Sequence, residues 1–260
     1  MEYRISYWCV THIGNVRSVN QDNYVCDGRY MKPEDEPMDA PLVGTLSSLN
    51  PALLGVFDGM GGEECGEVAA YIAAKNAAAV KIGAQPLDDL LRFCQNTNAE
   101  ICQQIEQRGI SSMGTTAAML AFDKEGITLC NIGDSKVLRF SQNGPEQISM
   151  DHVAVCPFGK KPPLSQNLGI PPTEMVIDPY FARGTYRDGD YYLICSDGLT
   201  DMLSPEAIQK ILYAAPEPEA ASLEMLRKAL LNGGKDNVTF ILCRIEKVRR
   251  GLGKLFAKKR

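Results

Sequence analysis

Short apolar runs rich in β-branched and aromatic residues recur along the chain, and Gly, Asp, Asn or Pro residues bound them. This pattern is typical of β-strands. The predicted strands are residues 5–10, 23–27, 52–58, 116–122, 126–134, 136–140, 174–181, 190–197 and 237–246. They come in consecutive groups rather than singly between helices.

Two pairs of longer segments are predicted to be helices from their apolar spacing and their Gly or Pro boundaries. The first pair is residues 63–82 and 87–108, and the second pair is residues 205–213 and 218–231. Strict alternation of strand and helix is missing, so a doubly wound parallel sheet is disfavoured. The order of the elements instead predicts a layered α+β fold.

The composition is that of a soluble globular protein, with 45% hydrophobic and 23% charged residues among 260. The sequence shows neither a signal-peptide pattern nor an apolar run near the roughly 20 residues of a membrane helix. Its nine cysteines are scattered and form no C-x-x-C pair. These features predict a reduced, cytoplasmic protein without a disulfide framework.

Charge is distributed unevenly along the chain. Residues 244–260 carry eight Lys or Arg and one acid, so the net charge of −5 conceals a strongly acidic remainder. An acidic body argues against binding of nucleic acid. Two interpretations of the basic end stay open: a solvated terminus, or a weak contact with anionic lipid or an acidic partner.

Five aspartates lie where predicted strands begin or end: Asp22, Asp58, Asp134, Asp197 and Asp236. One Asp-Gly or Asp-Asn pair alone indicates a turn. If several converge, two carboxylates about 4 Å apart repel each other by roughly 4 kcal/mol near a protein surface. Either their pKa values rise or a cation lies between them, and oxygen ligands favour Mg²⁺ or Mn²⁺.

Glycines surround two of these aspartates, in "GVFDGMGG" and "ICSDGL". Glycine permits close approach of the backbone and leaves a main-chain carbonyl accessible to a ligand. A dinucleotide-binding fingerprint is disfavoured, because Glu64 stands at the third glycine position of G-x-G-x-x-G. The glycines therefore favour a metal site over a nucleotide site.

Six motifs resemble, in order and spacing, those of the metal-dependent protein serine/threonine phosphatases of type 2C, in their bacterial branch. They are "GNVRSVNQD", "GVFDGMGG", "MGTTAA", "NIGDSKV", "LICSDGLTDML" and "GKDNVTFIL". The resemblance covers roughly residues 7–245. It implies a four-layer αββα sandwich, in which two antiparallel β-sheets are flanked by helix pairs. Residues 1–246 are then the catalytic domain and 247–260 a basic C-terminal tail.

The resemblance also implies a binuclear centre of Mn²⁺ or Mg²⁺ at one end of the sandwich. Asp58 would bridge both ions, the Gly59 carbonyl would ligate the second, and Asp197 and Asp236 would complete the first. Asp22 matches the acid that holds metal-bound waters.

Two further site residues follow from the same resemblance. Arg17 matches the arginine that binds substrate phosphate, which makes Arg17, Asp22 and Asp58 the candidate catalytic residues. Asp134, with Asp197, matches the pair that holds a third, weaker ion. The reaction implied is attack of a metal-activated water on phosphorus, without a phosphoenzyme.

Three features depart from the family pattern or vary within it. Met60 stands where many relatives have a histidine proposed as general acid, so the group that protonates the leaving oxygen is unassigned. Gln21 stands where eukaryotic members have a glutamate. The proline-rich flap, residues 153–178, is expected to help select phosphoprotein substrates, with Lys160 and Lys161 exposed. Cys195 is interpreted as core, and Thr115, Thr116, Asn237 and His152 as structural.

Two functions stay open at this point. The first is a monomeric phosphatase that removes phosphate from Ser or Thr in proteins phosphorylated by a partner kinase. The alternative is a catalytically silent module that keeps the fold for binding or regulation. Silent members usually lose metal carboxylates, whereas Asp58, Asp197 and Asp236 are all present, which favours the enzyme.

Overall fold

The computed structural model describes residues 1–60, 65–155 and 162–248. Its strands form two antiparallel sheets. The order in the first sheet is β3 (Leu42–Ser47), β1 (Tyr3–His12), β12 (Val238–Lys247), β11 (Tyr191–Cys195), β8 (Lys136–Ser141) and β9 (Gly144–Gln147). The order in the second sheet is β10 (Tyr180–Gly184), β7 (Ile127–Ile132), β6 (Ala117–Phe122), β4 (Ala52–Met60) and β2 (Asp22–Cys26), and β5 (Gly114–Thr115) pairs with β4.

An apolar core lies between the two sheets, and alternate side chains of both sheets fill it. Tyr7 and Ile194 of the first sheet and Leu54 and Leu120 of the second are at most 1% exposed. Burying a large apolar side chain contributes about 1.5–3 kcal/mol. The intervening side chains of the same strands point outward, where helices cover them.

Helices α1 (Gly66–Ala79) and α2 (Pro86–Arg108) cover the outer face of the second sheet. The buried side of α1 consists mostly of alanine, and small side chains let the helix lie close to the sheet. There it shares a buried cluster with Phe57 and Met119. The alanine-rich sequence thus fixes a tight helix–sheet contact directly behind the end of β4.

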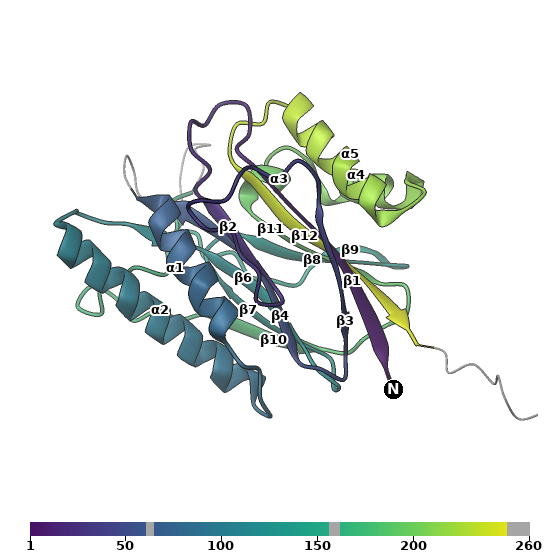
Figure 1. Ribbon diagram of the computed structural model, residues 1–260, viewed down its shortest axis with the longest axis horizontal. Helices are drawn as coiled ribbons and strands as arrows, with labels where there is room; N and C mark the ends of the chain where they lie inside the picture. The colour runs from purple at the N-terminus through teal and green to yellow at the C-terminus, as the bar shows by residue number, and fades with distance from the viewer. Residues whose placement is uncertain (61–64, 156–161, 249–260) are drawn as a thin grey trace, which may run out of the picture.

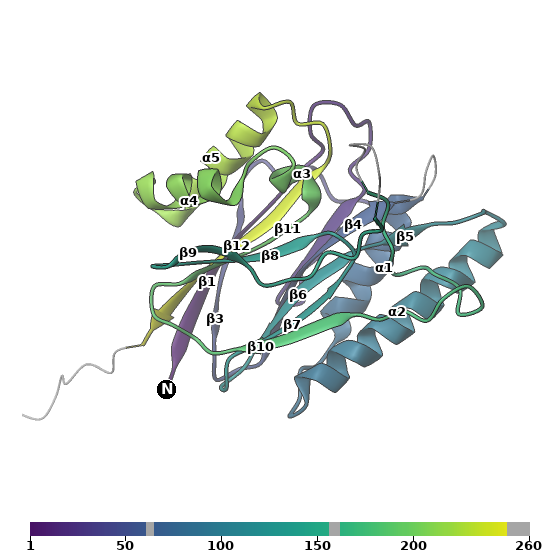
Figure 2. The same ribbon diagram turned by 180° about the vertical axis from the view of Figure 1, so that it is seen from behind.

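Helices α3 (Asp197–Thr200), α4 (Pro205–Ala214) and α5 (Pro218–Leu231) cover the outer face of the first sheet. Ser204 caps α4, since its side chain accepts a hydrogen bond from the backbone N–H of Ala207 at 3.3 Å. Figures 1 and 2 show the sheets between these helices and the α1–α2 pair. The predicted α+β sandwich of four layers is therefore confirmed.

The predicted strand over residues 174–181 is wrong for most of its length, because β10 begins only at Tyr180. The backbone N–H groups of Glu174 and Met175 both donate to the carbonyl of Pro171, at 2.9 and 3.2 Å. These bonds close a turn and leave the apolar residues that follow without a strand partner. An apolar run is thus insufficient for a strand when local turn bonds engage its backbone.

Other boundaries also differ from the predictions. The strands β3, β5 and β9 were not predicted, because they are short or carry exposed residues at a sheet edge. The helix predicted over 63–82 ends at Ala79, where Val80 turns to an extended conformation. Residues 63 and 64 of that prediction lie outside the described residues.

Within the described residues, no helix is long and apolar enough to cross a bilayer. The last strand, β12, continues through Lys247, one residue beyond the predicted domain boundary at 246. Most of the predicted basic tail, residues 249–260, lies outside the described residues.

Candidate active site

The beginning of β2 and the end of β4 lie side by side and bring Asp22 and Asp58 together. Asp22 is the first residue of β2, and the antiparallel register places it directly opposite Asp58 near the end of β4. Residues in this position have Cβ atoms about 4.5–5.5 Å apart, and like charges there destabilise the sheet. The fold therefore holds two carboxylates close together at one end of the second sheet.

The first sheet supplies Asp197 at the same end of the sandwich. Strand β11 leads into Ser196, whose hydroxyl donates to Asp22 Oδ2 at 2.8 Å. The next residue, Asp197, begins α3 and is 8% exposed. The backbone N–H of Thr239 in β12 also donates to Ser196 Oγ, at 3.0 Å. Ser196 thus joins the two sheets beside the carboxylates.

Glycine follows both Asp58 and Asp197 because the backbone is crowded there. A Cβ on Gly59 would lie 2.2 Å from the carbonyl oxygen of Gly66. A Cβ on Gly198 would lie 2.0 Å from the carbonyl oxygen of Asn237. Any side chain at either position would push these segments apart, so the glycines permit the close approach that the sequence predicts.

The five predicted aspartates lie near enough to one another for their charges to interact. Burial raises the pKa of Asp58 well above its ordinary value, and the negative charges of Asp22, Asp197, Asp134 and Asp236 raise it further. Burial is also the main cause that raises the pKa of Asp22 to about 7. In the described part of the chain, neither Asp22 nor Asp58 forms an ion pair. The facing carboxylates of Asp22 and Asp58 therefore repel each other and are repelled by their acidic neighbours.

Arg17 lies at the rim of this cluster. Its Nη2 donates to Asp236 Oδ2 at 2.8 Å, and this bond is the main cause that raises the pKa of the guanidinium. The charges of Asp58 and Asp197 act in the same direction. Since the side chain of Arg17 is 51% exposed, its planar fork remains accessible to an anionic ligand such as phosphate.

The donor chemistry of the cluster fits hard divalent cations, because carboxylate oxygens predominate and Asp22 and Asp58 repel each other. In the described residues, however, no group of three or more His, Cys, Asp or Glu side chains is arranged as a ready-made metal site. One predicted ligand, Asp236, is bonded to Arg17 instead. Metal binding by Asp236 would therefore compete with this bond to Arg17.

Asn237, interpreted from the sequence as structural, holds the loop that carries Arg17, a partner that the sequence did not reveal. Its Nδ2 donates to the carbonyls of Ile13 and Val19, each at 2.9 Å. Its Oδ1 accepts the backbone N–H of Gln21, also at 2.9 Å. These bonds fasten both ends of the loop to the residue that follows Asp236. The Asn in "GKDN" next to a predicted ligand was the available signal.

Thr115 and Thr116 hold the backbone of Asp58. The Thr116 hydroxyl accepts the N–H of Asp58 at 3.0 Å, and the Thr115 hydroxyl donates to its carbonyl at the same distance. Thr116 also shares a buried hydrogen bond of 2.6 Å with Ser135, next to Asp134. These contacts agree with the structural interpretation of both threonines.

The surroundings of Cys195 agree with its interpretation as a core residue. Cys195 is fully buried, and burial raises the pKa of its thiol to about 12. Such a thiol is a poor nucleophile, as the interpretation of Cys195 as core requires.

Gln21 donates from Nε2 to Glu67 of α1 at 3.2 Å, so it links the Arg17 loop to the helix that follows Asp58.

The flap contacts the second sheet and α2. Leu168 pairs with Thr115 through two backbone hydrogen bonds of 2.9 Å, and Asn98 of α2 donates to the carbonyl of Ile170. At the start of the flap, the N–H of Ser165 donates to the carbonyl of His152, at 2.9 Å. Lys160 and Lys161, predicted to be exposed, lie outside the described residues.

Comparison with known sequences agrees with the resemblance. The sequence profile described as "Protein phosphatase 2C" matches residues 26–157, just over half of the chain. The chain is 30% identical over 205 residues to the serine/threonine protein phosphatase PstP of Mycobacterium tuberculosis. That match covers 73% of the chain and 40% of PstP, so the chain spans less than half the length of this relative.

Two further similarities extend over nearly the whole chain. The serine/threonine phosphatase stp of Listeria monocytogenes is 24% identical over 260 residues, covering 93% of this chain and 96% of stp. A solved structure of the PstP catalytic domain, in complex with two manganese ions, is 26% identical with a TM-score of 0.76. The match covers 94% of this chain and 100% of that domain.

Proposed function

Because the chain belongs to the protein phosphatase 2C family, we propose that it is a metal-dependent protein phosphatase that hydrolyses phosphoserine and phosphothreonine. The observation that carries the proposal is the placement of Asp22 directly opposite Asp58. A fold gains nothing in stability from this pair. A cation bound by the two buried carboxylates would offset their repulsion.

In this proposal Asp58, the Gly59 carbonyl, Asp197 and Asp236 would hold two Mn²⁺ or Mg²⁺ ions. Asp134 contributes to a third, weaker site, and the manganese-bound PstP domain supports two main ions. When bound, such ions offset the carboxylate charge and lower the pKa of a coordinated water enough for attack on phosphorus.

The chain's own residues bind and orient the substrate. Arg17 releases Asp236 and donates its guanidinium N–H groups to two phosphate oxygens, which meets the charge that develops on them. Asn237 keeps the Arg17 loop at a fixed distance from Asp236, which lies just before β12. Asp22, held by the Ser196 hydroxyl, would orient a water coordinated by the ions.

Hydrolysis of a small aryl phosphate tests the proposal. We expect turnover with Mn²⁺, no turnover with a chelator, and a loss of turnover in Asp236→Asn. The control Asp190→Asn makes the same chemical change at a carboxylate that Arg139 neutralises elsewhere in the fold. Turnover that persists in the chelator, or that Asp236→Asn leaves unchanged, would contradict the proposal.

The catalytically silent module remains a second candidate. It is favoured by one observation, namely that the described residues form no ready-made metal site and Asp236 is engaged with Arg17. Calorimetric titration with Mn²⁺ separates the two candidates. Tight binding with turnover supports the enzyme, whereas absent binding and absent turnover support the silent module.

We further propose that its substrates are phosphoproteins made by a serine/threonine kinase, and that it acts as a cytoplasmic monomer. In this proposal residues 1–246 are the catalytic domain and the basic tail contacts anionic lipid or an acidic partner. Because β12 runs through Lys247 and Val248 donates to the carbonyl of Glu2, a deletion should begin at residue 249. Unchanged aryl phosphate turnover with weaker binding to anionic vesicles would support this division.

A further inference from the structure

A groove with a volume of about 860 Å³ opens beside Asp22. One end is lined by Val19 and Asn20, which follow Arg17 in the chain. From there the groove is lined by the turn at residues 31–38, by one side of α1 and by the last turns of α2 (both helices in Figure 1). It therefore continues directly from the place where the proposed function puts the substrate phosphate.

Apolar side chains make up much of the lining. They include Met31, Pro37, Met38, Val68, Tyr71 and Ile72. The volume is within the range of about 300–1,000 Å³ that is typical of ligand sites with mainly apolar walls. Methionine adapts its shape to different apolar partners, so this lining suits one large side chain of variable shape.

Hydrogen bonds preform the wall at residues 31–38. Asn23 is 3% exposed, donates to the carbonyl of Met31 at 2.9 Å and accepts the Met31 N–H at 3.0 Å. The N–H of Lys32 donates to Asp35 Oδ2 at 2.8 Å, and the Asp35 N–H donates to the carbonyl of Lys32 at 3.0 Å. Binding of a partner would therefore cost little conformational entropy in this wall.

The opposite wall is equally well defined. Val68, Tyr71 and Lys75 follow one another at three- and four-residue steps on α1, so they share one side of the helix. The ring of Tyr71 packs beside that of Tyr30, with centroids 6.0 Å apart. Both walls are therefore fixed before any partner arrives.

The acidic groups in the lining are engaged within the chain. Glu67 accepts a hydrogen bond from Gln21 at 3.2 Å, and Glu100 accepts one from Asn76 at 2.8 Å. The groove thus offers a partner its apolar side chains and, beside them, the basic side chains Lys32, Lys75 and Arg108. Its continuity with Asp22 and the Arg17 loop restricts that partner to a molecule that also reaches the phosphate position.

We propose that this groove binds the segment of the phosphoprotein substrate next to the phosphorylated residue and selects an aromatic or large aliphatic side chain there. The inference rests on the proposed function and adds a sequence preference to it. None of the described flap residues lines the groove. Selection by the groove and selection by the flap are therefore separable.

Photocrosslinking locates the bound peptide without catalysis. The probe is a peptide that carries a non-hydrolysable phosphonate analogue of phosphothreonine. A photoreactive benzoylphenylalanine is placed in turn at each position next to this analogue. Each peptide is irradiated with the full chain and Mn²⁺. We expect crosslinks at Met31, Met38 or Tyr71 from at least one position. Crosslinks confined to the flap or to other surfaces, or no crosslinks, would overturn the proposal. Crosslinks in the groove without aryl phosphate turnover would keep the groove and refute the phosphatase.

Kinetics provides the second measurement. For phosphothreonine peptides with and without an aromatic neighbour, we expect the full chain to favour the aromatic one by roughly tenfold in kcat/KM. Val68→Trp, which fills the groove, and Tyr71→Ala, which removes a wall, should abolish this preference and leave aryl phosphate turnover within about twofold. The exposed controls Leu223→Trp and Tyr213→Ala should keep it. A preference that survives in both groove variants would overturn the proposal.

Discussion

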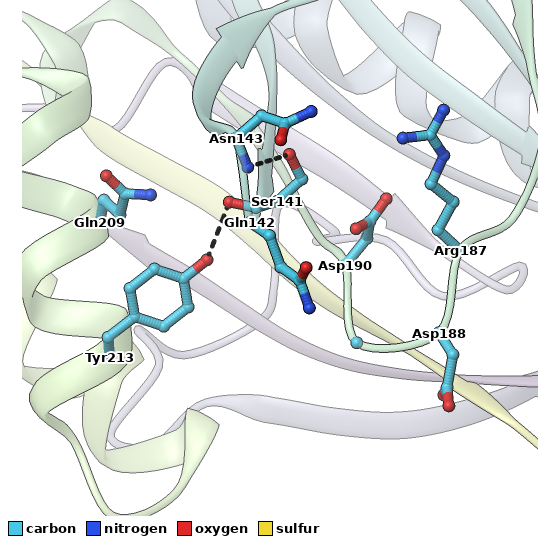
Figure 3. Close-up of a pocket in the computed structure, with 9 residues that line it drawn as sticks. Ser141, Gln142, Asn143, Arg187, Asp188, Asp190, Gln209 and Tyr213 are labelled. Atoms are coloured by element: carbon cyan, nitrogen blue, oxygen red, sulfur yellow. Dashed lines mark hydrogen bonds between the residues drawn. The ribbon is translucent and has the colours of Figure 1, made fainter.

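Buried aspartates in two regions of the protein differ in how their negative charge is balanced. At the loop before β11, Asp190 is 5% exposed, and Arg139 donates to its Oδ2 from both Nε, at 2.8 Å, and Nη2. Figure 3 shows Asp190 in a polar pocket with Arg187 and Tyr213. The carboxylate there has its counter-ion within the chain and needs no other.

The cluster around Asp58 has the opposite arrangement. Asp22 and Asp58 face each other without an ion pair in the described residues, and burial together with the neighbouring charges raises the pKa of Asp58. Arg17 lies at the exposed rim, where it pairs with Asp236. A single buried carboxylate thus does not indicate a site, whereas two carboxylates that face each other at a strand end without an ion pair favour the proposed cation.

The substitution Asp58→Asn should produce the largest effect. We expect aryl phosphate turnover to fall by about 10³-fold or more, since a lost metal ligand removes several kcal/mol of transition-state stabilisation. In the metal-free protein the same change should raise the melting temperature, because it removes a repelling charge. Turnover and thermal unfolding measure the two effects, and a stability loss alongside intact turnover would reverse the comparison.

At the balanced carboxylate, Arg139→Ala should destabilise the protein by about 2–3 kcal/mol, because it leaves Asp190 buried without its partner. Urea unfolding measures the change, and turnover per folded molecule should stay the same. Arg183→Ala is the matched control, since its pair with Glu125 is exposed, at 50% and 64%. That control should change stability by less than about 1 kcal/mol.

The metal-free protein should lose stability as the pH rises. Burial raises the pKa of Asp22 in the fold to about 7 from an ordinary 3.8, so the fold favours the protonated form. This contribution is complete below pH 3.8 and is lost as the pH rises through about 7. In a chelator we expect a loss of about 2 kcal/mol between about pH 5 and about pH 8. Mn²⁺ should restore stability, and a pH-independent Asp22→Asn variant would identify the group.

The smallest effect concerns the positioning of Arg17. Asn237→Ala removes three hydrogen bonds to the Arg17 loop, so we expect KM for the aryl phosphate to rise by about tenfold. Mn²⁺ affinity and kcat should change much less, which separates loop positioning from damage to the metal ligands. The exposed control Asn143→Ala should leave all three quantities unchanged. A fall in kcat alone would contradict the positioning role.

The sequence predicted the helix pairs and most strands well, because those segments have clear apolar periodicity. It failed where local backbone bonds decide, as at Pro171, whose carbonyl closes a turn inside an apolar run. It also failed at sheet edges such as β3, where half-exposed residues weaken the pattern. The family assignment is confirmed, whereas the metal-binding roles of the aspartates remain predictions.

By itself, the sequence determined that several aspartates stand at strand ends next to glycines, since residue type and local pattern are written directly in the chain. Only the tertiary structure decided that Asp22 and Asp58 are opposite each other, and that Asn237 fastens the Arg17 loop 200 or so residues away. Register and packing between distant segments depend on the burial of all the apolar faces together. No single stretch of sequence carries that information.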